Sequence, residues 1–365
     1  MKKRILNLHP FFFAVYPVLF YYSHNIKEIT LDVIFFPLAV VLGFCVVLWF
    51  LLFFLKHKKG IVLSLFFFMF FSYGHLAKLL FGAKVKLFFP ILYMSGFLVL
   101  LVGIFRLKKD LNKFISVLNI VSLFLVLISI FTIANYELKH RLRIAPLEYE
   151  NAAALNSEKT SDKEGNFPDI YYIIFDRYAN SETLAEFFDF DNTIFEKEME
   201  KRGFYTASGS KANYPYSYLS LASSLNYDYL DFIFDQVGVS ADQTIVYPLL
   251  KKSRAVQYLK SQGYKYYHLG TWWEPTRTNP LADETFLHES FAPPLFDLNE
   301  FSSKLIQTTL LDFFIKSFSS IKTESGGGGS QIVFYQFNQL EKIPQMEGPK
   351  YIFAHILLTH PPLFF

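Results

Sequence analysis

The stretch Pro168-Asp-Ile-Tyr-Tyr-Ile-Ile-Phe-Asp176 places a short run of apolar and aromatic residues directly before an aspartate. A run of this kind is typical of a buried strand in a parallel sheet. Ligands of open α/β sheets bind beside the carboxyl ends of the strands. The stretch therefore predicts a strand at 169–176 and places Asp176 at a metal or catalytic site. A helix cap or an ion pair with Arg177 would explain the same aspartate without chemistry.

A second motif follows downstream, where the chain reads Asn213-Tyr-Pro-Tyr-Ser-Tyr-Leu-Ser-Leu-Ala-Ser-Ser-Leu225. Pro215 favours a helix start nearby and puts Ser217 in the first turn. Backbone N–H groups and the helix dipole stabilise anions at such a start, so Ser217 is a candidate nucleophile. The alternative is a serine that only caps the helix, which is a common role.

The composition separates the chain into two parts. Of its 365 residues 52% are hydrophobic and 19% aromatic, and long apolar runs lie in the first 135 residues. The net charge is only +3, with basic residues gathered at the ends of apolar runs, which indicates membrane topology and not nucleic-acid binding. The single cysteine, Cys45, lies in an apolar run and is expected to pack there.

Spanning helices need about 20 predominantly apolar residues. Five stretches are candidates, at roughly 8–24, 31–55, 61–82, 87–105 and 114–135. With five spans, most lysines and arginines of the loops fall on the side of the N-terminus, although Lys139, Arg141 and Arg143 follow the fifth span on the other side. The positive-inside rule then predicts a multi-pass protein of the cytoplasmic membrane, with its N-terminus in the cytoplasm and its C-terminal part outside.

Three regions follow from this pattern: a transmembrane domain at 1–135, a polar linker at 136–167 and a globular domain at 168–365. Strands alternating with helices in the last region predict an α/β layer fold with a largely parallel sheet. The expected elements are strand 169–176, helix 181–202, strand 203–207, helix 217–226, helix 244–262, strand 263–269 and strand 350–358. Gly203 and Gly263 fall where helix C-terminal glycines belong. The tract 325–330 reads as flexible and receives no function.

Further site candidates come from two other stretches. His360 follows the last predicted strand, where it could donate to a phosphate or bind metal, whereas His355 lies mid-strand and is expected in the core. Trp273 and Arg277 follow the strand that ends near His268 and could supply an aromatic wall and an anion contact. Core packing is the alternative for the tryptophan.

Together these stretches resemble the alkaline phosphatase and sulfatase superfamily, above all its membrane-anchored branch of lipoteichoic acid synthases and phosphoethanolamine transferases. Those proteins place five spans before an extracytoplasmic, three-layer α/β catalytic domain. By this resemblance, 168–176 is the first strand with the first metal acid, and Ser217 stands where the family has its nucleophile. The stretch from His268 to Arg277 resembles a substrate-contacting segment, and 355–362 resembles the family's His-Pro-Pro segment.

The resemblance implies a metal-dependent phosphotransferase or phosphodiesterase that acts on lipid-linked or cell-envelope phosphate groups. Asp176 and Ser217 would hold a divalent metal, which could be zinc, manganese, magnesium or calcium, and Ser217 would form a phospho-enzyme. His360, Arg277, Trp273 and His268 would contact the substrate. Sulfatase activity is not expected, because the sequence after Ser217 lacks the proline and arginine of the formylglycine motif.

The sequence departs from the family pattern at one point, and this leaves two alternative functions open. The chain ends at Phe365, before the Asp-His pair that completes the family's metal site, so we expect the domain to be incomplete at its C-terminus. A non-catalytic envelope protein that uses the fold for binding is one alternative. A polytopic glycosyltransferase using Asp189 and Asp191 is another, since they form an Asp-x-Asp pattern. The sequence predicts no oligomeric state.

Overall fold

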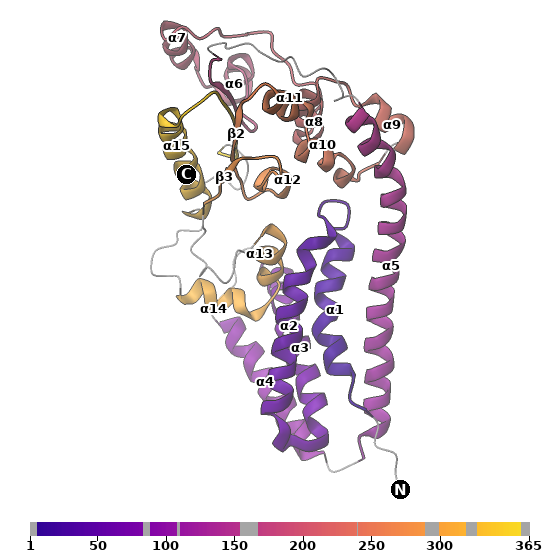
Figure 1. The fold of residues 1–365 in the computed structure, drawn as a ribbon. Helices are drawn as coiled ribbons and strands as arrows, with labels where there is room; N and C mark the ends of the chain where they lie inside the picture. The colour runs from indigo at the N-terminus through magenta and orange to yellow at the C-terminus, as the bar shows by residue number, and fades with distance from the viewer. Residues whose placement is uncertain are drawn as a thin grey trace. The chain divides into compact units, whose positions relative to one another are not determined.

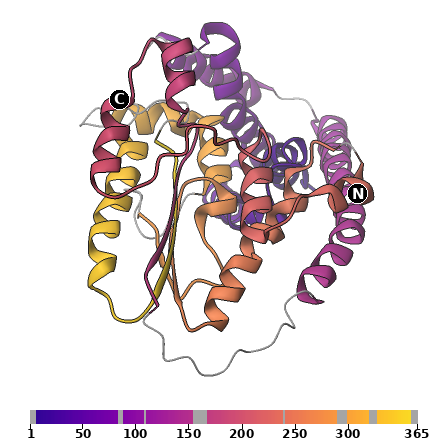
Figure 2. The same ribbon diagram turned by 90° about the horizontal axis from the view of Figure 1, so that it is seen from above.

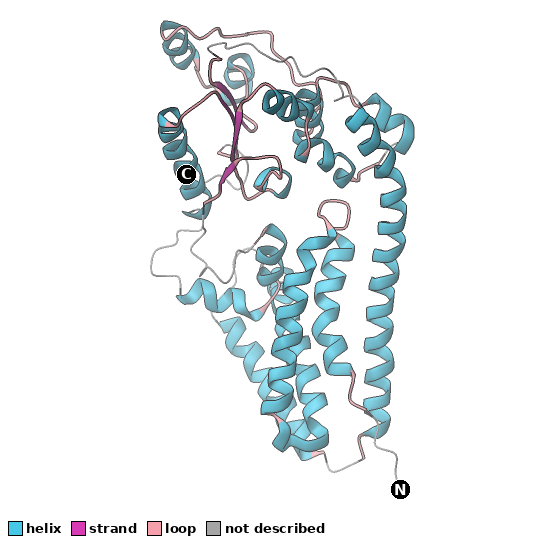
Figure 3. Cartoon of the chain, viewed as in Figure 1, coloured by secondary structure: helices cyan, strands magenta, loops and turns pink. Residues whose placement is uncertain are grey.

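A computed structural model of the chain describes residues 6–82, 88–107, 110–153, 167–238, 240–288, 299–318 and 327–358 (Figures 1 and 3). The chain divides into two compact units. Unit 1 comprises Met1–Ile144 and Ala292–Thr323, and unit 2 comprises Ala145–Phe291 and Glu324–Phe365. Unit 1 thus includes a stretch near residue 300 that the sequence analysis assigned to the globular domain.

Unit 1 is built mainly of long helices. In chain order they are α1 (His9–His24), η1 (Leu31–Ile34), α2 (Phe35–Leu51), η2 (Phe53–Lys58), α3 (Lys59–Phe81), α4 (Phe88–Arg106), α5 (Asn112–Ala153), α13 (Glu300–Gln307) and α14 (Leu310–Phe318). In the part of the chain that the structure describes, four helical segments are long and apolar enough to cross a membrane, which suggests membrane association: Leu31–Leu51, Lys59–Phe81, Phe88–Arg106 and Asn112–Leu142. A fifth span at 8–24 stays a prediction, since α1 has only 16 residues.

Polar contacts fix the direction of α1 in this bundle. The backbone N–H of His9 donates to Asn119 Oδ1 over 2.9 Å, and the Tyr22 hydroxyl donates to Glu137 Oε1 over 2.8 Å. Early residues of α1 therefore meet early residues of α5, and late residues meet late ones, so the two helices run parallel. Their apolar faces pack together with α2 and α3 around buried residues that include Ala14, Val18, Phe67 and Val126.

The predicted linker at 136–167 is not irregular throughout, because α5 continues to Ala153. Tyr136 and Glu137 belong to this helix, and Glu137 is a partner of Tyr22. The tract predicted to be flexible at 325–330 also differs in part, since α15 (Gly327–Lys342) begins within it. Residues 325 and 326 lie outside the described residues.

Unit 2 contains a parallel sheet of four described strands. They are β1 (Ile170–Phe175), β2 (Lys265–Leu269), β3 (Glu284–Phe286) and β4 (Lys350–Ile356), in the order β1-β4-β2-β3. All three pairings are parallel, as predicted. The three long strands match predicted ones, whereas the short β3 was not predicted.

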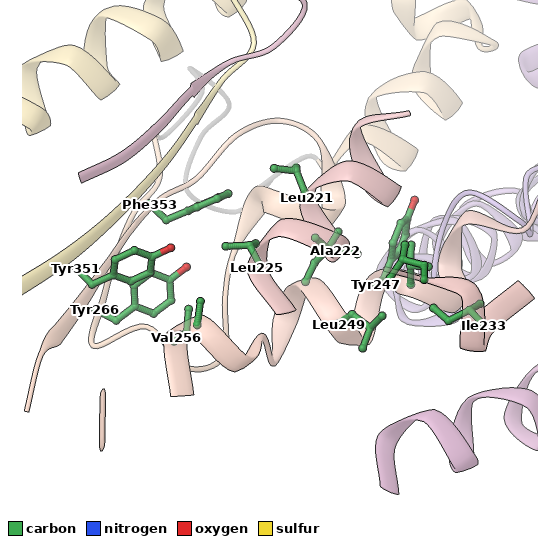
Figure 4. Packing of buried hydrophobic residues seen from close by; sticks show 14 of the residues in the cluster. Leu221, Ala222, Leu225, Ile233, Tyr247, Leu249, Val256, Tyr266, Tyr351 and Phe353 are labelled. Carbon is green, nitrogen blue, oxygen red and sulfur yellow. The ribbon is translucent and has the colours of Figure 1, made fainter. Parts of the chain in front are cut away.

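Helices cover both faces of this sheet (Figure 2). One face packs against α8 (Ser217–Asn226), η3 (Gln243–Val246), α10 (Tyr247–Lys251) and α11 (Arg254–Ser261), and the other against α15. Side chains of a strand alternate between faces. In β4, Tyr351 and Phe353 therefore face α8 and α11, while Ile352 and Ala354 face α15. Figure 4 shows the first of these cores, where the rings of Tyr266 and Tyr351 stack.

The remaining elements of unit 2 are short. They are α6 (Ser181–Phe188), α7 (Thr193–Lys201), α9 (Asp231–Val237), α12 (Glu274–Arg277) and η4 (Ile343–Gln345).

Two predicted helices are interrupted. Helix 181–202 is divided into α6 and α7, because Asp189 ends α6 in the left-handed region at φ 51°. Helix 244–262 is divided into η3, α10 and α11, and Ser253 is the cap residue that starts α11. The glycine predictions are confirmed, since Gly203 and Gly263 both follow helix ends at φ 89°.

The strand predicted at 203–207 does not form. Phe204 and Tyr205 follow the end of α7 in an irregular segment, and Tyr205 is 91% exposed. A strand needs a neighbour to bond its backbone groups. The pairings of the described sheet do not include this segment.

Candidate functional site

The sheet sets the direction of Asp176. Ile170, Tyr172 and Ile174 of β1 pack on the face that carries α8. With a period of two, the next side chain on this face is Asp176. Its backbone N–H donates to the carbonyl of Ile356 over 3.0 Å, which continues the pairing with β4 to the end of the strand. Asp176 is only 6% exposed.

A tight turn follows Asp176 directly. Arg177 adopts φ 60°, which is unusual for a residue that is not glycine, and Tyr178 N–H donates to the carbonyl of Phe175 over 3.2 Å. Such conformations cost free energy and cluster at functional sites. The turn lets the chain leave the sheet at once, so that Asp176 stands at the strand end.

Ser217 is the first residue of α8, as the sequence predicted for the helix start. The preceding Tyr216 is extended and provides no side-chain cap. Ser217 follows the cap position, and its hydroxyl donates to Asp176 Oδ1 over 2.7 Å. The structure thus brings together the two residues that the sequence analysis paired, and it disfavours the cap as the reason for this serine.

His355 completes the group, and the sequence analysis missed it. It was expected in the core, and it is indeed 1% exposed, but its Nε2 lies 3.5 Å from Asp176 Oδ1. In the register of the sheet, His355 pairs with Ile174. The alternation of side chains along the strand could have revealed it, because His355 shares the face of Tyr351 and Phe353 at the carboxyl end of a parallel strand.

A chain of hydrogen bonds between buried polar groups leads away from His355 Nδ1. Thr276 Oγ1 lies 3.1 Å from His355 Nδ1 and 2.9 Å from Thr271 Oγ1. The carbonyl of Thr276 is 2.9 Å from His268 Nε2, and His268 Nδ1 is 2.8 Å from the Tyr266 hydroxyl. Thr276 and the loop before α12 therefore hold the imidazole of His355 in place.

His268, predicted to contact the substrate, lies within this chain of hydrogen bonds. Both of its ring nitrogens have protein partners, and the side chain is 2% exposed. Burial lowers the pKa of His268 to about 4, so the ring is neutral at neutral pH. A direct substrate contact would require one of these hydrogen bonds to break.

The other residues predicted to contact the substrate lie in different places relative to Asp176, Ser217 and His355. The ring of Trp273 meets that of His355 edge-on, with 5.7 Å between centroids, so it forms a wall beside the group. Arg277 ends α12 directly after Thr276 and is half-buried. His360 lies outside the described residues.

The Asp-x-Asp pattern has a structural role in this fold. Asp191 Oδ1 accepts a hydrogen bond from the backbone N–H of Thr193 over 2.9 Å at the start of α7. Backbone and side-chain hydrogen bonds from Thr193 lower the pKa of Asp191. Asp189 ends α6, and both aspartates are exposed. Helix boundaries therefore account for the pattern that favoured a glycosyltransferase.

The site residues fit a divalent metal as a partial set of ligands. The described residues include no group of three or more His, Cys, Asp or Glu side chains that could hold a metal ion. Asp176 and His355 provide two donors of the types that zinc accepts, and Ser217 adds a hydroxyl oxygen. Among the described residues, the buried Nε2 of His355 has no hydrogen-bond partner, which is unfavourable for an imidazole unless another group binds it.

The order of the three groups decides what chemistry they can perform. In a Ser-His-Asp triad the imidazole lies between the hydroxyl and the carboxylate and takes the serine proton. Here Asp176 lies between Ser217 and His355, and the hydroxyl donates directly to the carboxylate. The geometry therefore matches a serine activated by a carboxylate, and not an acyl-transfer triad.

Comparisons with models of protein families, with curated proteins and with solved structures found no match. The resemblance to the alkaline phosphatase and sulfatase superfamily therefore stays a prediction from the sequence.

Proposed function

We propose that this chain is a membrane-anchored phosphotransferase or phosphodiesterase of the sulfatase-like type, with Ser217 as its nucleophile. The observation that carries the proposal is the 2.7 Å hydrogen bond from the Ser217 hydroxyl to the buried Asp176 carboxylate. The parallel sheet with helices on both faces supports an alkaline-phosphatase-like fold. Its substrate would be a lipid-linked or envelope-polymer phosphate group.

The position of Ser217 on α8 suits attack on phosphorus. The first N–H groups of a helix have no partner within the helix, and the helix dipole favours negative charge there. No side chain caps α8 at Tyr216. A phosphate oxygen could therefore bind at this helix start, with its phosphorus within reach of the Ser217 oxygen.

The reaction would proceed in two balanced steps. Ser217 Oγ forms a bond to phosphorus, the ester bond to the departing alcohol breaks, and the serine proton passes to Asp176 and on to the departing oxygen. An acceptor alcohol or water then attacks the phosphorus of the phosphoserine, the bond to Ser217 Oγ breaks, and the acceptor's proton passes through Asp176 to Ser217. An alcohol acceptor makes the protein a transferase, and water makes it a phosphodiesterase.

Asp176, Ser217 and His355 would hold the divalent metal that the family resemblance implies. When bound, such a metal polarises the phosphate and lowers the pKa of the serine hydroxyl. His355 is kept in one orientation by Thr276, and the ring of Trp273 limits access of water to it. The donor types do not select among zinc, manganese, magnesium and calcium.

Unit 1 supplies the membrane anchor in this proposal. Its lysines and arginines predict a cytoplasmic N-terminus, which would place unit 2 outside the cytoplasmic membrane. Envelope phosphate groups are found on that side.

The test is a hydrolysis assay on the full chain in nanodiscs, with a phosphodiester, a phosphomonoester and a sulfate ester as parallel substrates. Each of the four metals is added separately. We expect phosphodiester turnover that Ser217→Ala reduces by about a thousandfold or more, while the matched variant Ser224→Ala retains it.

Two results would overturn the proposal. Turnover that is equal in Ser217→Ala and the parent protein would exclude the serine as nucleophile. Absence of turnover with every substrate and metal, in a protein that remains folded, would favour the binding protein on the same fold.

A further inference from the structure

The stretch 299–318 lies in the sequence between two parts of unit 2, but it packs as part of unit 1. It follows β3 and precedes α15 and β4, so the chain returns to the helical bundle before it forms the strand that carries His355. Within unit 1, α13 contacts η1 and α14 contacts α3. This observation is independent of the proposed function.

Two contacts hold the segment 299–318 against the other helices of unit 1. Phe301 of α13 is 3% exposed, and its ring lies 5.4 Å from that of Tyr21 at the end of α1. Between α13 and α14, the carbonyl of Thr308 accepts a hydrogen bond from the backbone N–H of Gly74 in α3 over 2.9 Å. A β-carbon at Gly74 would overlap the carbonyl oxygen of Gln307, so this close approach requires glycine.

The α14 helix is apolar on two sides. Leu310 and Phe313 pack on a cluster formed by Tyr73 and Ala77 of α3 and by Phe89 and Tyr93 of α4. Another set of apolar side chains on α14 is partly exposed: Leu311, Phe314 and Ile315, at 41%, 41% and 46%. Their spacing of three and four residues makes one continuous stripe.

We propose that α14 lies in the lipid–water boundary of the bilayer, with Leu311, Phe314 and Ile315 inserted among the acyl chains. Its nine described residues are too few to span the membrane, which suits a helix that lies at the bilayer surface. The residues it packs against lie late in α3 and early in α4, near one end of both helices.

We choose the bilayer as the partner of this stripe because the exposed apolar residues of α14 adjoin an exposed apolar surface of α3 and α4. The same ends of α3 and α4 expose Leu79, Leu80, Phe88 and Ile91, on helices that can cross a membrane.

The experiment uses the full chain in nanodiscs, with Cys45→Ala removing the single native cysteine. A bimane label is placed on Phe314→Cys, and quenching is measured with lipids that carry a spin label at shallow or deep positions. Leu98→Cys in the middle of α4 is the deep reference, and Lys201→Cys on the exposed α7 is the aqueous reference.

We expect the label at position 314 to be quenched several-fold more by shallow than by deep lipid spin labels, whereas Leu98→Cys shows the reverse. Quenching equal to that of Lys201→Cys would place α14 in water and overturn the proposal. Protection from both lipid and water-soluble quenchers would also overturn it, since protein would then cover the stripe.

A second pair of variants tests the anchor. Gly74→Ala should lower the shallow quenching at position 314 at least twofold, because the added methyl group displaces the Thr308 segment. Gly96→Ala in α4 has no atom within 4 Å of the new carbon and should leave the signal unchanged. Equal signals in these two variants would contradict the docking of 299–318 on α3.

Discussion

Ser217 donates its hydroxyl hydrogen to Asp176 Oδ1 over 2.7 Å, although the two residues are 41 positions apart. One residue ends a strand and the other begins a helix, so the contact joins the sheet to α8. A carboxylate that accepts directly from a serine makes the serine oxygen more nucleophilic. The predictions below test this contact and the groups that hold it.

Asp176→Asn should reduce phosphodiester turnover by about a hundredfold to ten-thousandfold, because an amide neither takes the serine proton nor carries charge for a metal. Steady-state kinetics with a melting curve for each variant measure this effect. Asp228→Asn is the control, since that side chain is 51% exposed. Comparable activity in Asp176→Asn and the parent would show that the carboxylate is not used.

Thr276→Val should reduce turnover about tenfold to a hundredfold, since Thr276 orients His355 through Nδ1. Thr276→Ser keeps the hydroxyl and should recover most of the activity. The pH profile of kcat should shift in the valine variant and not in the serine variant. A valine variant with the parent's pH profile would assign Thr276 to packing alone.

The stability of unit 2 should depend on pH through His268. Burial lowers its pKa from 6.5 to about 4 in the folded state, so the unfolded chain binds a proton at higher pH than the folded one. Stability is therefore lost as pH falls from 6.5 towards 4, by about 3 kcal/mol at the limit. His268→Gln should show a smaller decline over this range in denaturant unfolding curves. An identical decline in both proteins would refute this assignment.

An ion pair between a buried lysine and a partly exposed aspartate joins the starts of β1 and β4. Lys350 Nζ lies 3.0 Å from Asp169 Oδ2, and the lysine side chain is 5% exposed. Asp169→Ala should cost about 1–3 kcal/mol, because it removes the anion beside an ammonium whose other partners are the carbonyls of Met346 and Gly348. Lys350→Met removes that charge and should cost less when unfolding free energies are compared. The opposite ranking would contradict this view of the pair.

The sequence predicts those features of the fold that have local signals. Apolar runs located the long helices, and the run before Asp176 located a strand of the parallel sheet. The positive φ of Gly203 and Gly263 followed from their place after helical patterns. The helix break at Asp189 was missed, because its cause is a left-handed residue without glycine or proline to mark it.

The candidate site was predictable only in part, for a physical reason. Asp176 and Ser217 stand beside recognisable strand and helix boundaries, so each could be found separately. His355 is mid-strand by sequence, and its role depends on the register between β1 and β4, which pairs it with Ile174. Docking of 299–318 on α3 includes a close backbone approach at Gly74, which no periodic pattern reveals.

The most direct test of the central claim is to trap the covalent intermediate. The full chain in nanodiscs is mixed with a phosphodiester, quenched in acid during turnover, digested and analysed by mass spectrometry. We predict a phosphate ester on Ser217 in the parent protein and none in Ser217→Ala. Sustained turnover with an unmodified Ser217, or with phosphate on another residue, would contradict the account.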